Sequence, residues 1–387
     1  MLITAERILT GTDVLCPGWL EITDGTISAL GQGTPPRPID PTAGDLELGP
    51  QIVVPGFVDM HTHGGGSGAF PDATEQSSRT AVALHRRHGT TTLIASLVSA
   101  HPEELLREVS VLGEQVQEGL IAGIHLEGPW LSSRRCGAHE PSALRRPDPA
   151  EISRVFAAAK GGIRMVTIAP ELDGALPAIH QIVELGAVAA VGHTDATYDQ
   201  ARAAIAAGAT VATHLFNAMR PVHQREPGPV VALGEDPRVT VEMITDGVHL
   251  HPALYRAVSC EVGPDRVALV TDAMAAAGMA DGSYNLGELA VEVREGVARL
   301  AGTDTIAGST ATMDRLFRNA VVNSGLPRDE ALALAVRQTS INPARAVGLP
   351  EAGLVVGRPA DLVVLDADLR VQRVLHRGSW VDGVMKD

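Results

Sequence analysis

The chain has 387 residues, of which 45% are hydrophobic and 20% are charged, so it has enough aliphatic surface for a large core and is not disordered. Acidic residues outnumber basic residues by 46 to 31, and the formal net charge of −15 argues against binding to nucleic acid or to an anionic membrane. Three widely spaced cysteines, no signal-peptide core and no apolar run long enough to span a bilayer predict a cytoplasmic protein.

The two ends of the chain have the pattern of short β-strands. The first segment contains a turn at Asp24-Gly25 and leaves through a stretch rich in proline and glycine. Strand-like runs return at Asp361–Leu365 and Arg370–Leu375. We expect residues 1–52 and 350–387 to pair as one small β-sandwich domain.

Between these ends, a short β-branched run followed by a helical stretch recurs eight times. This recurrence predicts a (β/α)8 barrel over residues 53–349, although an open doubly wound sheet would give a similar pattern. A β-hairpin near residues 282–301 would interrupt the last connection. The expected strands are Ile52–Val54, Thr90–Leu97, Leu120–Leu126, Ile163–Ile168, Ala187–Val191, Ala209–Thr213, Val239–Ile244 and Val267–Val270, and the expected helices include Glu75–His88, Pro102–Glu118, Thr197–Ala207 and Ser309–Asn323.

Polar side chains follow most of these strands, and in a barrel the carboxyl ends of all strands meet at one mouth. Side chains alternate along a strand, so His61 and His63 face the same way and can chelate one ion together. A single histidine at a strand end is usually only hydrogen-bonded, and a lone HxH is a weak motif. A whole set in register instead indicates a divalent metal site, with zinc favoured and iron or another ion possible. The set comprises His61, His63, Glu127, His193, His214 and Asp272.

Other residues narrow this interpretation. The only lysines are Lys160 and Lys386, so a Schiff-base lysine or a carboxylated lysine bridging two metal ions has almost no candidate. His125 is expected to pack beside the site rather than to bind metal. Cys136 is either a reactive thiol of a lid or an incidental loop cysteine. The remaining histidines are expected at the surface: His85, His88, His101, His180 and His376.

The sequences HTHG, HLEGP, VGHTDA, THLFNAM, ITDGVH, VTDAM and IAGS, in this order, resemble the amidohydrolase superfamily and, more narrowly, the N-acetylglucosamine-6-phosphate deacetylase family. The resemblance covers nearly the whole chain, and the HLEGP and HLFNAM…HQREPGP blocks are its most specific parts. It implies Glu127, His193 and His214 as core metal ligands, with glutamate in the place of the carboxylated lysine of relatives. Since His61 and His63 are both present, a second ion is chemically possible, giving one or two ions per subunit.

The resemblance also implies the reaction, which is hydrolysis of the acetamide of N-acetyl-D-glucosamine 6-phosphate to D-glucosamine 6-phosphate and acetate. Asp272 would be the catalytic acid and base, and His249 would polarise the acetyl oxygen and contact the substrate. Arg225 would bind the phosphate in a neighbouring chain, which implies a homodimer, although a loop arginine beside Glu226 is more often a solvated ion pair. The other implied substrate contacts are Ala138, His139, Asn217, Ala218, Ile306, Ala307 and Gly308.

Two other functions remain open. Another metal-dependent amidohydrolase, acting on a different N-acyl or cyclic amide, would share the metal ligands but not Arg225 or the HLEGP context. Examples are an imidazolonepropionase and an N-acyl amino acid hydrolase. A non-enzymatic binding protein on the same barrel would be expected to lose metal ligands, whereas every ligand position is filled here.

Overall fold

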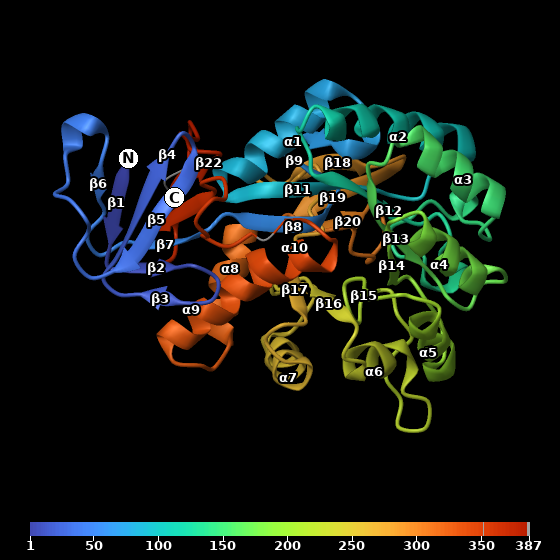
Figure 1. Cartoon of the computed structure of the whole chain (residues 1–387). Helices are drawn as coiled ribbons and strands as arrows, with labels where there is room; N and C mark the ends of the chain where they lie inside the picture. Colours follow the sequence, from blue (N-terminus) through green and yellow to red (C-terminus); the bar gives the residue numbers. More distant parts are fainter. Residues whose placement is uncertain (351, 385–387) are drawn as a thin grey trace.

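The computed structural model describes residues 1–350 and 352–384. A β-sandwich lies at one end of the molecule and contains both the N-terminal and the C-terminal strands, while a barrel wrapped in helices forms the rest (Figure 1). The predicted fold class, a (β/α)8 barrel with a small β-sandwich, is therefore confirmed.

The sandwich consists of two sheets whose facing side chains form a separate hydrophobic core, which includes Ile8, Leu20 and Leu362. Its centre joins the two ends of the chain, because β7 pairs in parallel with β2 and antiparallel with β21. One sheet has the order β5 (Thr26–Gln32), β4 (Gly18–Thr23), β1 (Leu2–Ala5) and β6 (Leu46–Glu47). The other has the order β23 (Ser379–Trp380), β22 (Val371–His376), β21 (Leu362–Leu365), β7 (Ile52–Pro55), β2 (Arg7–Leu9) and β3 (Val14–Leu15).

The prediction that Ile52–Val54 is the first barrel strand is wrong. This run is β7 of the sandwich, and the first barrel strand is β8 (Phe57–Thr62). Both strands are fully buried, so hydrophobicity alone does not separate them. They are divided at Gly56, where a Cβ atom would lie 2.1 Å from the side-chain oxygen of Thr91. The proposed domain division at residue 52 falls within β7 and remains a prediction.

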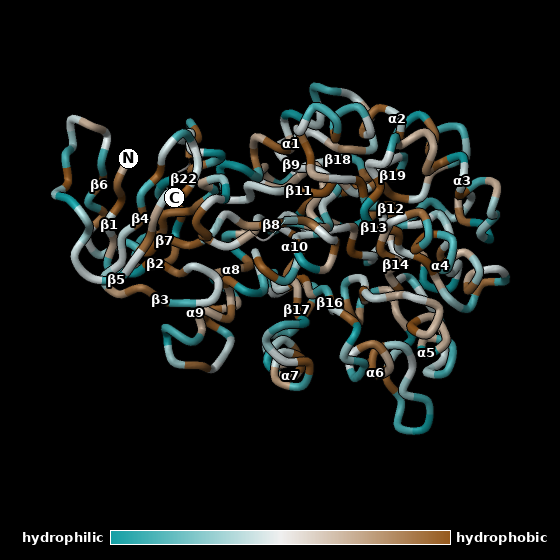
Figure 2. The backbone as a smooth tube through the Cα atoms, viewed as in Figure 1, coloured by the Kyte–Doolittle hydropathy of each residue, from teal (hydrophilic) through white to brown (hydrophobic). Residues whose placement is uncertain are grey.

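The barrel is one sheet of eight parallel strands, and its apolar segments run through the interior (Figure 2). The backbone N–H of Asp272, just after β17, donates to the carbonyl of His61 in β8 at 2.9 Å, which ties the last strand to the first. The other strands largely match the expected runs, although β15 is shorter. In sheet order the strands are β17 (Val267–Leu269), β16 (Thr240–Met243), β15 (Val211–Ala212), β14 (Val188–Val191), β13 (Ile163–Ile168), β12 (Gly123–Glu127), β11 (Thr90–Leu97) and β8.

A helix follows each barrel strand, as the sequence predicts. Thr197 and Gln200 form a capping box at the start of α5, so local sequence fixes that boundary. The predicted helix at Ser309–Asn323 begins only at Met313, because Ser309 instead pairs with Ala273 at the end of the last strand. The helices are α1 (Glu75–Arg87), α2 (Pro102–Gln117), α3 (Pro149–Ala158), α4 (Ala175–Glu184), α5 (Tyr198–Ala206), α6 (Gly228–Glu235), α7 (Pro252–Val262), α8 (Met313–Asn323), α9 (Arg328–Val336) and α10 (Asn342–Ala346), with a π-helical turn at Arg337–Ile341.

The insertion before α8 has three antiparallel strands, β18 (Gly282–Leu286), β19 (Leu289–Arg294) and β20 (Val297–Leu300), rather than the two strands of the predicted hairpin. A smaller pair, β9 (Gly64–Gly65) and β10 (Gly68–Ala69), follows the first barrel strand. No helix in residues 1–350 or 352–384 is long and apolar enough to cross a membrane.

Two of the histidines predicted at the surface are not there. His85 is completely buried on the inner side of α1, where its Nε2 lies 2.8 Å from the carbonyl oxygen of Gly64. Burial lowers the pKa of His85 to about 4. His88 is largely covered and pairs with Asp314 at 3.2 Å. The prediction failed because the two histidines share one face at the end of α1, and only packing shows that this face points inward.

Candidate active site

A cavity of about 400 Å³ opens at the mouth where the barrel strands end. Twelve of the residues that the sequence singled out line it, so side chains far apart in the chain meet there. They are His63, Glu127, Ala138, His139, His193, His214, Asn217, Ala218, His249, Asp272, Ile306 and Gly308. His61 lies directly behind His63, with its Nε2 3.2 Å from that of His63.

Three of these residues have backbone conformations that non-glycine residues rarely adopt. The φ angles of His193, His214 and Asp272 are 46°, 26° and 47°, in the left-handed region. Each follows a barrel strand, and the reversed backbone turns the side chain back into the mouth. Such strained conformations are typical of functional sites, where the surrounding fold holds them in place.

Glu127, at the end of β12, is the centre of one group of potential metal ligands. Its Oε1 lies 3.1 Å from Nε2 of His193 and 2.9 Å from Nε2 of His214, and the two ring nitrogens are 3.1 Å apart. Ligand atoms at the usual zinc distances would lie ~3.3 Å apart in a tetrahedron, so these spacings suit a small divalent ion.

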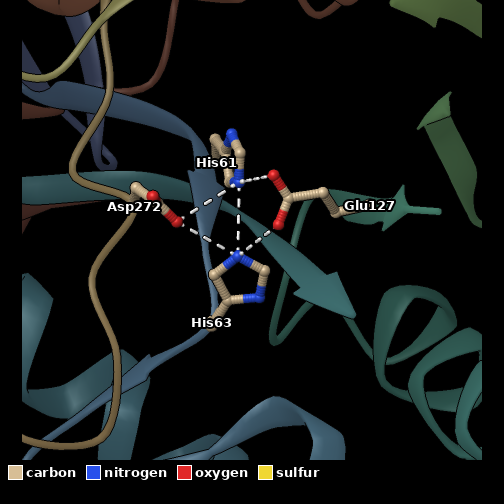
Figure 3. A group of neighbouring side chains, drawn as sticks. All are labelled: His61, His63, Glu127 and Asp272. Carbon is tan, nitrogen blue, oxygen red and sulfur yellow. Dashed lines mark hydrogen bonds and ion pairs between the residues drawn. The ribbon is translucent and has the colours of Figure 1, made fainter. Parts of the chain in front are cut away.

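The second group shares Glu127 and adds the two strand-1 histidines. His61 and His63 project from β8 toward Glu127 on one side and Asp272 on the other (Figure 3). Nε2 of His63 lies 3.1 Å from Glu127 Oε2 and 3.2 Å from Asp272 Oδ1, and Nε2 of His61 lies 3.5 Å from Glu127 Oε1 and 3.4 Å from Asp272 Oδ1. Glu127 therefore contacts both groups: its Oε1 faces His193, His214 and His61, and its Oε2 faces His63.

Hydrogen bonds at the far ring nitrogens decide which histidines can offer a lone pair to a metal. The Nδ1–H of His193 donates to the carbonyl of Arg135 at 2.9 Å, which leaves Nε2 free to bind an ion. His139 is different, because its Nδ1 accepts the backbone N–H of Ser99 at 3.1 Å and its Nε2 therefore carries the proton. His139 thus lies against Glu127, at 3.4 Å, as a hydrogen-bond donor rather than a metal ligand.

The electrostatics of the cluster favour a cation. Burial alone would raise the pKa of the Glu127 carboxyl, but His61 and His193 hold it well below its usual range. Burial would also raise the pKa of Asp272, which His61 and His63 lower to about 2. In turn, burial opposes protonation of His61, yet Glu127 and the neighbouring carboxylates raise its pKa well above the usual value. The buried carboxylates therefore favour positive charge among them, which a divalent ion would supply.

His249 and Asp246 form a pair at the opposite wall of the cavity. Nδ1 of His249 lies 2.9 Å from Oδ2 of Asp246, and Oδ1 of Asp246 accepts the backbone N–H of His249 at 2.9 Å. Burial opposes ionisation of Asp246, but these bonds keep its pKa below the usual value. The contact with Asp246 fixes the orientation of the His249 ring in the cavity wall. Asp246 was missed because its role depends on this contact.

Not every predicted contact lies in the mouth. Ala307 is fully buried and its N–H donates to the carbonyl of Ala298, so it supports the cavity wall instead of facing the cavity. Arg225 is exposed in the loop before α6 and is not among the residues lining the cavity of its own chain. That loop protrudes from the lower edge of the barrel (Figure 1).

Two arginines that the sequence analysis did not assign to the site do line the cavity. Arg134 and Arg135 both pair with Asp195, at 3.4 and 2.8 Å, and Arg220 pairs with the same carboxylate at 3.1 Å. Three guanidinium groups around one carboxylate leave an excess of positive charge beside the mouth. The arginine doublet between HLEGP and His139 is the signal that could have found them.

His125 packs as predicted, between Ser96 and Thr167.

With this geometry established, comparison with known proteins identifies the family. A family model described as the amidohydrolase family matches residues 52–387. The chain belongs to the amidohydrolase family. The family is metal-dependent, in agreement with the two groups of potential ligands around Glu127.

Several members of this family that are similar to the chain are deacetylases of amino sugar phosphates. A mutant of the N-acetyl-D-glucosamine-6-phosphate deacetylase of Mycobacterium smegmatis, solved in complex with N-acetyl-D-glucosamine-6-phosphate, is 64% identical, with a TM-score of 0.97 over 98% of this chain and 99% of that chain. The N-acetylgalactosamine-6-phosphate deacetylase of Escherichia coli O157:H7 is 35% identical over 98% of both chains. The N-acetylglucosamine-6-phosphate deacetylase of Vibrio furnissii is 33% identical, over 98% of this chain and 93% of its own. The family resemblance expected from the sequence motifs is confirmed.

Proposed function

We propose that this amidohydrolase hydrolyses the acetamide of N-acetyl-D-glucosamine 6-phosphate to D-glucosamine 6-phosphate and acetate, in amino sugar catabolism or recycling. One observation carries the proposal. The His, Glu and Asp side chains named from the sequence converge around Glu127 in a chain 64% identical to a deacetylase that binds this sugar phosphate. The cavity, at about 400 Å³, has a volume typical of small-molecule sites.

Glu127, His193 and His214 would hold the essential divalent ion, and His61 and His63 would hold a second. Their nitrogen and oxygen donors favour zinc, and iron would fit the same set. When bound, such an ion supplies a Lewis acid for the acetyl carbonyl and lowers the pKa of the attacking water.

The protein side chains would move the protons. Asp272 is ionised, since its pKa is about 2, and its Oδ1 faces the cluster, so it can take a proton from the attacking water. The same carboxyl then delivers the proton to the departing amine nitrogen. His249, held at Nδ1 by Asp246, would polarise the acetyl oxygen and stabilise the negative charge that develops there.

The phosphate requires positive charge in an acidic protein. Arg225 would supply it to the neighbouring subunit of a homodimer, and its exposed position outside its own cavity supports this assignment. The guanidinium plane suits bidentate contact with phosphate. Arg134 and Arg135 would add local positive charge at the mouth.

Cytoplasmic location is proposed because the sequence has few cysteines and the substrate class belongs to metabolism.

A second candidate substrate is N-acetyl-D-galactosamine 6-phosphate, because a relative 35% identical over 98% of both chains has that specificity. The decisive experiment measures acetate release from both sugar phosphates and from unphosphorylated N-acetylglucosamine, with bound metal counted in the same preparation. The proposal expects the highest kcat/KM for N-acetyl-D-glucosamine 6-phosphate. Preference for the galactose epimer would favour the second candidate, and no acetate release from either phosphate would refute both.

A further inference from the structure

Glu242, on β16, is a completely buried carboxylate that the mechanism above does not use. We infer that Glu242 is the positioning residue of the second metal position: it orients His61 and supplies the negative charge that allows a second cation to bind. This inference rests on the proposed metal centre. It concerns a residue four strands away from Glu127 in the barrel sheet, and this residue is not among those that line the cavity.

The geometry places Glu242 against residues of both metal positions. Its Oε2 lies 3.0 Å from Nδ1 of His61 and also accepts the backbone N–H of His214 at 3.0 Å. Among the described residues, His61 is its one ion-pair partner. Its other oxygen is buried and forms no hydrogen bond in the described part of the chain. A buried carboxylate with so few partners is costly unless positive charge lies nearby.

The hydrogen bond fixes the tautomer of His61. A carboxylate oxygen that already receives an N–H can only accept, so Nδ1 of His61 carries the proton. The lone pair is then on Nε2, which points at His63 and lies between the carboxylates of Glu127 and Asp272. Carboxylates that bind the outer nitrogen of a metal-binding histidine in this way set the ring orientation and strengthen its basicity.

Charge counting points to the same conclusion. As metal ligands the four imidazoles of the two groups would be neutral, and three buried carboxylates lie around them: Glu127, Asp272 and Glu242. One divalent ion leaves an uncompensated negative charge in this buried region, whereas a second divalent ion removes that deficit. If Glu242 served only to accept the backbone N–H of His214, removing its charge would not change the affinity for the second ion.

The distinguishing experiment removes the charge of Glu242 and keeps the shape of its side chain. Glu242→Gln retains an oxygen that can accept a hydrogen bond, and Glu108→Gln is the matched control, since Glu108 is equally buried on α2 but has no hydrogen bond to the cluster. Apoprotein is titrated with Zn²⁺ calorimetrically, with elemental analysis of the dialysed product. We expect the wild type and Glu108→Gln to bind two ions. In Glu242→Gln the affinity for the second ion should fall about 10- to 100-fold while the first is retained.

Two unchanged binding steps in Glu242→Gln would overturn the inference, as would a single ion in the wild type. If Glu242→Gln does not fold, the wild type still provides a test. Nitrogen-15 chemical shifts of labelled histidines in the zinc-loaded protein should show His61 protonated at Nδ1, and an Nε2 proton would overturn the assignment. Glu242→Asp, which restores the charge, should recover part of the second-ion affinity. Absence of deacetylase activity in a wild type that binds two ions would refute the proposed function and leave this inference standing.

Discussion

The carboxylate of Asp59 on the first barrel strand accepts hydrogen bonds from both the hydroxyl and the backbone N–H of Thr271, the residue directly before Asp272. β8 and β17 are the two end strands of the sheet, so this contact helps close the barrel. Asp59 also accepts the N–H of His61. The closure of the barrel and the placement of two site residues therefore depend on one buried carboxyl group.

Thr271→Val should destabilise the protein, because it removes the hydroxyl and leaves a fully buried carboxyl oxygen unpaired. We expect a loss of about 1–3 kcal/mol in the free energy of unfolding, measured by denaturant titration. Thr303→Val, at an exposed hydroxyl on the insertion, serves as the control. Equal stability of the Thr271 variant and the wild type would show that this contact does not stabilise the junction between β8 and β17.

Asp272→Asn should abolish most turnover while the protein stays folded and loaded with metal. The amide cannot take a proton from water, so kcat should fall roughly 10²–10⁴-fold, as for other general acid–base groups. Steady-state kinetics on protein of known metal content provides the measurement. Near-normal activity in a fully loaded variant would rule out the assigned proton transfer.

Replacing both His61 and His63 by alanine should lower the number of bound ions from two to one. The ligand atoms of Glu127, His193 and His214 already meet without them, so the first position should survive. Elemental analysis after dialysis against a weak chelator measures the number of bound ions per chain. The same metal content in the wild type and the double variant would argue against a binuclear centre.

Arg225→Ala should weaken binding of the phosphorylated sugar and leave the poor activity on the unphosphorylated sugar unchanged. Loss of one charge-assisted contact of about 1.5–3 kcal/mol corresponds to a rise in KM of about 10- to 150-fold. The phosphate is remote from the scissile amide, so kcat should change less.

Mixing subunits tests whether Arg225 acts across a dimer. In a heterodimer of Arg225→Ala with Asp272→Asn, one mouth would contain an intact Asp272 and receive the neighbour's intact Arg225, so some activity should return. Failure of confirmed heterodimers to recover activity would place Arg225 at its own chain's mouth.

Glu108 gives the stability a pH dependence that is independent of the metal centre. Burial, with Glu104 nearby, raises the pKa of its carboxyl from 4.5 to about 8. Between these pH values the folded chain keeps a proton that the unfolded chain releases, so the free energy of unfolding falls as pH rises. The loss at pH 8 is at most about 5 kcal/mol. Glu108→Gln should therefore be more stable than the wild type at pH 8, and thermal unfolding at pH 5 and 8 should show a smaller difference for the variant.

The sequence predicted the barrel and most of the mouth because strand ends carry the polar residues there. Alternation along β8 was enough to place His61 and His63 on one side, and all the proposed metal ligands do meet. β7 was misassigned because a buried sandwich strand and a buried barrel strand have the same composition.

The supporting carboxylates could not be predicted in this way. Asp59, Asp246 and Glu242 act through hydrogen bonds that depend on strand register and loop geometry. The left-handed backbone at His193 and His214 is also invisible in the sequence, since histidine has no local preference that enforces it.

The pairing of β7 with β21 also dictates an order of events on the ribosome. β7 ends at Pro55 and its partner begins at Leu362, so the whole barrel is translated before the central pair of the sandwich can form. Until then, one edge of β7 has no partner strand. A nascent chain stalled late in translation would expose this unpaired edge to chaperones or to other chains. All residues of the barrel are therefore synthesised before the domain in which the chain begins can be completed.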